Sequence, residues 1–275
     1  MTETRAAHGT VVLTVADGLA HVELDRAETL NSLTGEVMAD LVEIGRSLIE
    51  RHDVGAVVLS GRGRAFCAGL DVSEFGRMVS GGGGSPESAQ LPASQEPLGA
   101  ARAVAQQCVH VWSLVPAPVI AAVQAVAYGG GLQIALGADV RIASRELKAS
   151  MMEVNWGIIP DMCGTQLLTR LVGPGRAKLT ILTGRVIDAE TALAWGMVDE
   201  LADDANATAL ALGRELAEKS RPALREAKKL VDLAATADLA EGFAAEQKAI
   251  RSLIGGPEQQ EAVAKRMTEL RARKG

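Results

Sequence analysis

Two short apolar segments near the N-terminus predict a β-hairpin. Residues 10–15 (TVVLTV) and 20–24 (AHVEL) are alternately or continuously apolar, and Asp17-Gly18 lies between them. An Asp-Gly pair favours the tight turns that join antiparallel strands, because both positions tolerate a positive φ. The chain is therefore expected to begin with a pair of adjacent strands.

A helix and a buried strand are expected next. Thr34 is a suitable N-cap for an amphipathic segment that runs to about Arg51. The β-branched run 54–60 (VGAVVLS) has the composition of a strand that is buried on both faces. The strand is predicted to end at the glycine-containing turn 61–69.

The same order of elements repeats later in the chain. Residues 119–127 read as a second buried strand, followed by the glycine triplet 129–131, a short helix and a strand at 139–144. Strands that end in glycine-rich turns at the start of helices are typical of α/β proteins. We therefore predict an α/β fold.

The second half of the chain changes character and becomes mostly helical. Residues 188–196 resemble a capped helix that ends at Gly196. Four amphipathic segments follow, at 203–219, 221–235, 237–254 and 257–272. We predict a core with the active site at 1–200 and a helical region for packing or assembly at 201–275.

The segment between about Val79 and Ala100 is rich in Gly, Ser, Pro, Gln and Glu. Such a composition is typical of a surface loop. A lid is the alternative interpretation, because the segment lies between two glycine-rich turns.

Charge and cysteine content exclude several classes of protein. The net charge is −6 and no basic stripe is available, which argues against a nucleic-acid partner. The three cysteines, Cys67, Cys108 and Cys163, are odd in number and lack metal-ligand spacing, which favours a reducing cytoplasm and no metal site. The N-terminus has no apolar core, and the longest apolar stretch contains two prolines, so neither a signal peptide nor a membrane span is expected.

Candidate chemistry is concentrated around the glycine triplet. Gly129, Gly130 and Gly131 precede a helix, so their backbone N–H groups can face a developing oxyanion. Two carboxylates, Glu153 and Asp161, follow in a loop that has almost no other charge. Backbone donors beside isolated carboxylates suit proton transfer on a carbonyl compound.

Several segments together resemble the crotonase (enoyl-CoA hydratase/isomerase) superfamily. The resemblance covers about residues 10–200 in order and rests on 64–71 (RAFCAGLD), 118–131 (PVIAAVQAVAYGGG), 138–143 (ADVRIA), 157–160 (GIIP), the segment Asp25-Arg26…Leu30-Asn31-Ser32-Leu33, and the segment Leu182-Thr183-Gly184-Arg185…Gly196-Met197-Val198.

This resemblance implies a fold, an assembly and a ligand. The fold would be a crotonase-like spiral of ββα repeats with a C-terminal α-helical trimerisation region, assembled as homo-trimers or hexamers. The ligand would be an acyl-CoA thioester, with CoA as part of the substrate and no separate cofactor. CoA would bind near Arg26, Ala68 and Gly69, and Lys265 or Arg266 of a neighbouring subunit could assist, although a solvated helix face explains these two residues as well.

The resemblance also implies site residues. The backbone N–H groups of Leu70 and Gly130 would form an oxyanion hole for the thioester oxygen. Hydratases of the family carry a glutamate at the position of Gln133 and another at that of Glu153. Because an amide does not exchange protons, Gln133 could only orient a water or a substrate, and Glu153 is the expected proton donor or acceptor.

Asp161 bears on the choice between isomerisation and hydration. Family members that move two double bonds, the dienoyl-CoA isomerases, have an aspartate at this position, whereas hydratases have a small residue. Those isomerases also have an aspartate at the position of Gln133, so the match is incomplete. The alternative role for Asp161 is to cap the helix expected at 164–171.

Other side chains have simpler explanations. Asp71 is expected to cap the turn that follows it. Trp156 is a candidate wall of the acyl pocket, although core packing explains it equally well. The overall expectation is an enzyme that shifts a double bond of an unsaturated acyl-CoA, with hydration as the first alternative and a catalytically weak acyl-CoA-binding scaffold as the second.

Overall fold

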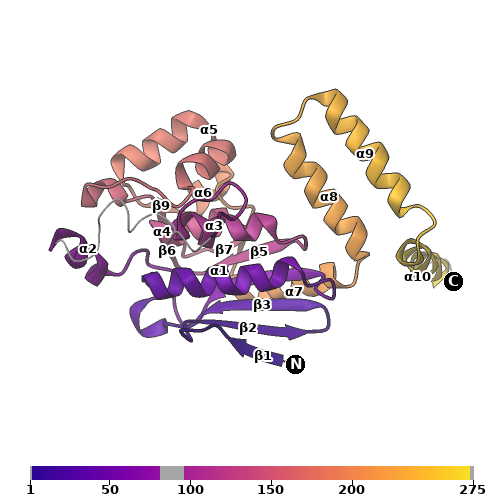
Figure 1. Cartoon of the computed structure of the whole chain (residues 1–275), viewed down its shortest axis with the longest axis horizontal. Coiled ribbons are helices and arrows are strands. Elements are labelled where there is room, and N and C mark those ends of the chain that lie inside the picture. Colours follow the sequence, from indigo (N-terminus) through magenta and orange to yellow (C-terminus); the bar gives the residue numbers. More distant parts are fainter. Residues whose placement is uncertain (1, 81–95, 273–275) are drawn as a thin grey trace.

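The computed structural model describes residues 2–80 and 96–272, and most of its core is built on one sheet (Figure 1). In the described chain this sheet has the strand order β1-β2-β3-β4-β5-β7-β10. The first three strands pair antiparallel, and β3, β4, β5, β7 and β10 run parallel. The strands are β1 (Thr2–Arg5), β2 (Val11–Ala16), β3 (Leu19–Leu24), β4 (Ala56–Gly61), β5 (Val119–Val123), β7 (Val140–Ser144) and β10 (Glu200–Ala202).

A smaller sheet lies beside the main one. Its order is β6-β8-β9, and its strands are β6 (Val126–Tyr128), β8 (Lys148–Ser150) and β9 (Ile187–Asp188). The described helices are α1 (Gly35–Ile49), α2 (Val72–Val79), α3 (Val104–Leu114), α4 (Gly130–Leu136), α5 (Gly164–Thr183), α6 (Ala189–Trp195), α7 (Ala205–Ala217), α8 (Arg221–Ala234), α9 (Leu239–Leu253) and α10 (Pro257–Ala272), with 3-10 turns at Ala27–Thr29 and Glu153–Trp156. The α/β prediction is confirmed.

Alternation along the central strands buries both faces of the main sheet. In β4, Val57 and Leu59 join the core beneath α1 and α3, whereas Ala56 and Val58 face α7. This explains why residues 54–60 are apolar throughout rather than alternating.

Two local predictions are confirmed in detail. β2 and β3 pair from Val11↔Leu24 to Ala16↔Leu19, with Asp17 and Gly18 at positive φ in the turn. Thr34 caps α1, and its hydroxyl oxygen accepts a hydrogen bond from the backbone N–H of Val37.

The single strand predicted over 119–127 is wrong. The chain pairs with the main sheet over Val119–Val123 and then turns at Ala125, which has φ 49°. Val126–Tyr128 pairs with β8 in the smaller sheet. An apolar run does not indicate where a strand changes its partner, so the pattern alone could not locate this turn.

A buried carboxylate attaches the N-terminal segment to α1. Asp40 accepts hydrogen bonds from the backbone N–H and ring Nδ1 of His8, and from the backbone N–H and hydroxyl of Thr10, at 2.7–3.0 Å. Burial opposes ionisation of Asp40, but these hydrogen bonds outweigh it and hold its pKa below the usual value.

We expect Asp40→Ala to lower the free energy of unfolding by about 2–4 kcal/mol at neutral pH, because four hydrogen bonds to a buried carboxylate are lost together. Since the folded-state pKa of Asp40 is lowered, its contribution is complete above the usual pKa and is lost as pH falls through the folded-state value. Urea unfolding at pH 7 and at lower pH measures both effects.

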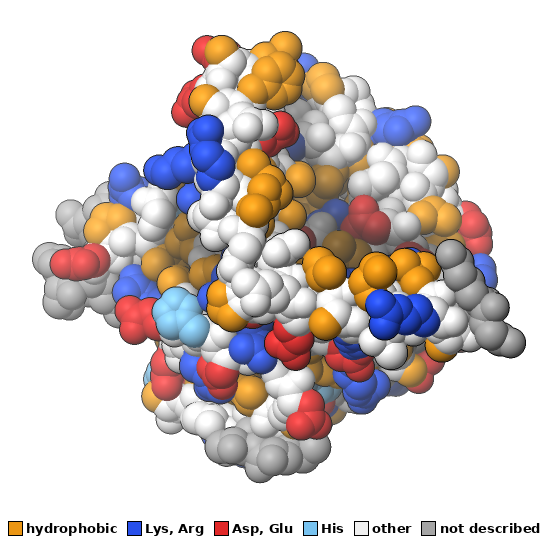
Figure 2. Space-filling model, turned by 90° about the vertical axis from the view of Figure 1, so that its right-hand side faces the viewer, with side chains coloured by type: hydrophobic (Ala, Val, Ile, Leu, Met, Phe, Trp, Pro, Cys, Tyr) orange, Lys and Arg blue, Asp and Glu red, His pale blue; other side chains and the backbone are white. Residues whose placement is uncertain are grey.

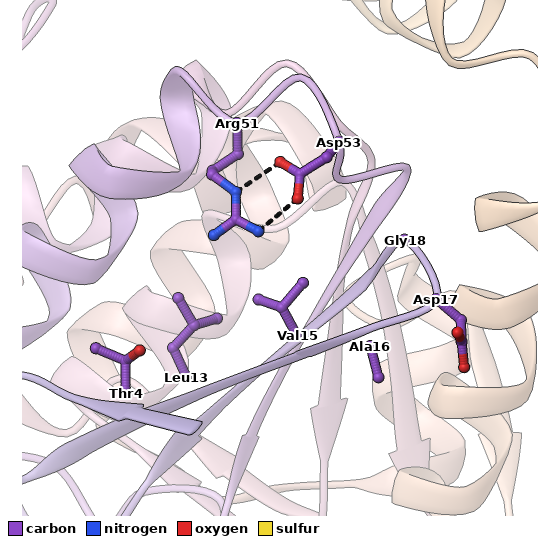
Figure 3. Close-up of a pocket in the computed structure, with 8 residues that line it drawn as sticks. All are labelled: Thr4, Leu13, Val15, Ala16, Asp17, Gly18, Arg51 and Asp53. Carbon is purple, nitrogen blue, oxygen red and sulfur yellow. Dashed lines mark hydrogen bonds and ion pairs between the residues drawn. The ribbon is translucent and has the colours of Figure 1, made fainter. Parts of the chain in front are cut away.

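Asp53→Ala is the matched control for this prediction. Asp53 forms an exposed ion pair with Arg51 at the edge of a surface hollow lined by β2 (Figure 3). Exposed pairs contribute about 1 kcal/mol or less. Equal losses in the two variants would contradict the role given to Asp40.

The last helices form an arm beside the core (Figure 1). α7 packs on β3, β4, β5, β7 and β10, and α8 and α9 contact each other. The half-buried ammonium of Lys228 on α8 bonds Asp139 at 2.8 Å and the carbonyl of Val115 at 2.8 Å, which attaches the arm to the core.

Among residues 2–80 and 96–272, no helix combines the length and the apolarity that a membrane crossing requires.

Candidate active site

Two backbone turns lie in contact at the centre of the predicted site. A β-bridge joins Cys67 to Ala127, and the backbone N–H of Tyr128 donates to the carbonyl of Cys67 at 3.1 Å. Gly69 has φ 89°, and a Cβ there would lie 2.7 Å from the carbonyl oxygen of Tyr128. Only glycine allows the two turns to approach this closely.

The turns carry the two predicted oxyanion donors. Gly129 has φ 48° and is followed by α4, so the N–H of Gly130 lies in the first turn of a helix and has no intrahelical partner. Among the hydrogen bonds of residues 2–80 and 96–272, neither the N–H of Leu70 nor that of Gly130 has an acceptor. Two free N–H groups on adjacent turns can bind one oxyanion.

The carboxyl group of Glu153 is buried beside these turns. Its residue is only 8% exposed, and a Cβ on Gly129 would lie 3.2 Å from its Oε1 atom. Among the described atoms, Oε2 is buried and has no hydrogen-bond partner. A buried carboxyl with one free oxygen is suited to accept and return a proton.

The pKa of Glu153 is raised above its usual value. Burial is the main cause, and the negative charge of Asp161 adds to it. A backbone N–H and the side-chain amide of Gln133 act in the opposite direction, because they stabilise the ionised form.

Gln133 bridges Glu153 and the start of α5. Its amide Nε2 donates to Oε1 of Glu153 at 2.7 Å, and its amide oxygen accepts from the backbone N–H groups of Met162 and Gly164, both at 2.9 Å. Gln133 is thus in contact with the predicted proton carrier. The two backbone partners were not foreseen, because no side-chain pattern marks a backbone donor.

Asp161 lies on the same loop, at the protein surface. The alternative that it caps the following helix is wrong, because the N-cap of α5 is Cys163, at φ 68°. Although the residue is exposed, protein atoms around its carboxyl raise its pKa through partial burial. Water can therefore reach the Asp161 carboxyl from the protein surface.

Arg26 and Asp71 form a cluster at the mouth of the first turn. Asp71 accepts a hydrogen bond from Ser32 at 2.7 Å and caps α2 by accepting from the backbone N–H of Ser73. Hydrogen bonds from Ser32 and Ser73 lower the pKa of Asp71 to about 2. The cap expected for Asp71 is therefore confirmed. The guanidinium of Arg26 lies 3.4 Å from Asp71, and this ion pair holds Arg26 near loop 64–71.

Trp156 lies on the 3-10 turn that begins with Glu153. It is 51% exposed and stacks on Phe75 of α2, with ring centroids 4.2 Å apart. The sequence did not predict this pairing, because Phe75 and Trp156 are 81 positions apart and no local pattern links them. The core-packing explanation of Trp156 is wrong, because much of the ring faces solvent.

The surface loop predicted for residues 79–100, with a lid as the alternative, falls largely outside the described residues, since positions 81–95 are not described. The buried thiols of Cys67 and Cys108 have raised pKa values because burial disfavours the thiolate. This is consistent with packing rather than nucleophilic roles.

Comparison with known proteins agrees with this geometry. The family model described as enoyl-CoA hydratase/isomerase matches residues 14–270. The chain belongs to the enoyl-CoA hydratase/isomerase family. The match extends into the helical arm, beyond the region on which the crotonase resemblance was based, and that resemblance is confirmed.

Relatives and solved structures support the same assignment. The chain is 32% identical over 245 residues to "Probable enoyl-CoA hydratase echA8" of Mycobacterium tuberculosis, covering 88% of this chain and 89% of that protein. It is 37% identical over 213 residues to "Probable enoyl-CoA hydratase EchA17" of the same species, covering 77% and 76%. The crystal structure of an enoyl-CoA hydratase from Bacillus anthracis superposes with a TM-score of 0.81 at 27% identity, covering 94% and 96%, which confirms the crotonase-like fold.

Proposed function

We propose that this protein shifts a double bond of an unsaturated acyl-CoA through an enolate intermediate. One observation carries the proposal: Glu153 is a buried carboxyl with one oxygen held by Gln133 and the other without a partner. It lies beside the turn that presents the N–H of Gly130. A proton carrier next to an oxyanion site is what this reaction requires.

The reaction balances with one proton removed and one returned. Ionised Glu153 takes a proton from the carbon next to the thioester, and the electron pair moves onto the thioester oxygen. The N–H groups of Leu70 and Gly130 stabilise the resulting enolate. Glu153, or Asp161 in its protonated form, then delivers a proton to the far end of the conjugated system, and the double bond ends closer to the thioester. Where Asp161 delivers the proton, Glu153 gives up its own proton to water and Asp161 regains one from water.

Asp161 is proposed as the second proton carrier. It lies on the loop that Gln133 connects to Glu153, and its charge acts on the Glu153 carboxyl. Two carboxyls at different places along one acyl chain can remove a proton at one carbon and deliver it at another.

Asp161→Asn is expected to move the acid limb of the kcat/KM profile to lower pH. Glu153 must be ionised to act as the base, so the acid limb reports its pKa. Because this pKa is raised, the limb lies at a higher pH than the ionisation of a free glutamate. Removing the negative charge of Asp161 removes one cause of the raised pKa, so Glu153 ionises at lower pH. Profiles of kcat/KM against pH for both proteins measure the shift.

Glu146→Gln removes a carboxylate from an exposed position and is the control for this shift. An acid limb that stays in place in Asp161→Asn, or moves upward, would show that Asp161 does not act on the catalytic base.

Hydration of a 2-enoyl-CoA is the second candidate function. It is favoured by the names of the relatives, which are described as enoyl-CoA hydratases. Against it, the family's first hydratase glutamate is replaced here by Gln133, whose amide oxygen already accepts two backbone hydrogen bonds. Hydration would therefore depend on Glu153 for the activation of water.

We also propose that the helical region 201–275 serves assembly into trimers or hexamers. Apolar side chains at the surface of α8–α10 support this, and Figure 2 views the molecule from the side on which these helices lie. The exposed apolar residues there are Val231, Leu239, Phe243, Ile250, Ile254, Val263, Met267 and Leu270. Exposed apolar surface of this extent is typical of an interface between protein chains.

The CoA moiety is proposed to lie near Arg26, Ala68 and Gly69, with the acyl chain passing towards Trp156. The proposal rests on the position of Arg26 at the mouth of loop 64–71 and on the exposed ring of Trp156. No cofactor other than the CoA of the substrate is required by the proposed steps.

A further inference from the structure

Gln133 connects three elements of the site through one side chain. It lies in α4, which begins at the proposed oxyanion residue Gly130, and it is only 1% exposed. Its amide reaches Glu153 in the 3-10 turn and the backbone at the start of α5. One buried side chain thus makes three hydrogen bonds to two other elements of the site.

The orientation of the amide is determined by its partners. The backbone N–H groups of Met162 and Gly164 can only donate, so the group that faces them must be the amide oxygen. The NH₂ end is therefore directed at Glu153, where it donates to Oε1 at 2.7 Å. A flipped amide would lose both backbone hydrogen bonds.

This arrangement limits how the Glu153 carboxyl can lie. One of its oxygens is occupied by the amide, and the other, Oε2, is buried without a partner among the described atoms. An amide N–H also stabilises the ionised carboxylate, which is the form that removes a proton. Gln133 therefore acts on both the direction and the charge of Glu153.

The same side chain holds the loop that carries Asp161. Cys163 has φ 68°, a backbone conformation that residues other than glycine rarely adopt. The backbone N–H groups of its neighbours Met162 and Gly164 both donate to Gln133. A Cβ on Gly164 would lie 2.6 Å from the amide oxygen, so only glycine leaves room for this contact. The strained turn is thus stabilised from inside the site.

We propose that Gln133 is a positioning residue: its amide fixes the Glu153 carboxyl and the Met162–Gly164 turn in one arrangement and leaves the second carboxyl oxygen for the substrate. This inference rests on the proposed function only in naming Glu153 as the proton carrier. It takes the place of the expectation from the sequence that Gln133 orients a water or a substrate.

Two variants separate the two parts of this role. Gln133→Met keeps the approximate length of the side chain but removes both the donor and the acceptor. Gln133→Glu keeps an acceptor for the backbone of Met162 and Gly164 and removes the donor to Glu153. Gln166→Met, at an exposed position of α5, is the matched control.

The readout is the pH at which Glu153 ionises, followed by the infrared C=O band of its protonated carboxyl. The band is assigned to Glu153 by its loss in Glu153→Gln. Because Gln133→Glu adds a carboxyl of its own, the Glu153 band in that variant is assigned by its loss in the double variant Gln133→Glu, Glu153→Gln. We expect the midpoint to move to higher pH in both Gln133 variants and to stay unchanged in Gln166→Met. We also expect Gln133→Met to lower kcat by about 10²-fold, because a small misplacement of a catalytic group has that effect, with little change in KM.

The outcomes are distinguishable. Unchanged midpoints in folded Gln133→Met and Gln133→Glu would overturn the proposal, and if Gln133→Met does not fold, Gln133→Glu still tests it. If the midpoints move but the wild-type protein turns over no enoyl-CoA, the positioning role stands and the proposed function fails.

Discussion

Glu153→Gln is expected to lower kcat for double-bond migration by about 10²–10⁴-fold, which is the contribution typical of a general acid–base group. The substitution keeps the size of the side chain and removes its ability to exchange a proton. Binding of a saturated acyl-CoA should change little, because the backbone donors of Leu70 and Gly130 are untouched. Steady-state kinetics and calorimetric binding measure the two quantities.

Glu146→Gln serves again as control, since it removes a carboxylate that is exposed at the surface. Activity that survives nearly intact in Glu153→Gln would show that another group moves the proton. Loss of binding together with loss of turnover would instead indicate a damaged site.

Gly69→Ala is expected to lower kcat by about 10²–10³-fold, as removal of an oxyanion donor does in other enzymes. A Cβ at this position would lie 2.7 Å from the carbonyl oxygen of Tyr128, and the residue has φ 89°. The turn that carries Leu70 must therefore move away from the turn that carries Gly130, and the two N–H groups would no longer converge. Kinetics on the folded variant, checked by circular dichroism, measure the loss.

Gly76→Ala is the control, because a Cβ on Gly76 meets no atom within 4 Å and its φ lies outside the left-handed region. We expect nearly unchanged kcat in this variant. If Gly69→Ala folds and retains full turnover, the contact between the two turns does not support an oxyanion site.

The fold was predictable from the sequence where local chemistry decides it. Asp17-Gly18 determined the hairpin turn, Thr34 the start of α1, and Asp188 with Gly196 the two ends of α6. Each is a residue whose side chain or φ preference acts within a few positions. The turn at Ala125 was not predictable, because alanine carries no preference for a positive φ.

The sequence predicted which residues belong to the site, but not the hydrogen bonds and ring contacts that join them. The motifs placed Glu153, Gln133 and the glycine turns in one site, and the structure brings them together. The partners of the Gln133 oxygen are backbone groups 29 and 31 positions away, which no side-chain pattern reveals. The stack of Phe75 on Trp156 depends in the same way on the tertiary placement of α2.

These connections give the glutamine at position 133 a physical meaning. A glutamate there would place a second carboxylate against Glu153, as the hydratase pattern implies, whereas the amide supplies a donor and cannot exchange a proton. We therefore propose Glu153 as the single buried proton carrier, with Asp161 as a second carboxyl nearer to solvent.

The most direct test is an absorbance assay with two substrates, a 2-enoyl-CoA and a 3,5-dienoyl-CoA. Moving the two double bonds of the second substrate extends conjugation with the thioester and adds a band at longer wavelength, whereas hydration of the first substrate bleaches its absorbance. We predict that the long-wavelength band grows faster than the 2-enoyl-CoA absorbance is bleached, and that Glu153→Gln abolishes this growth. Bleaching without the new band would contradict the account in favour of a hydratase, and binding of both esters without any spectral change would identify a scaffold.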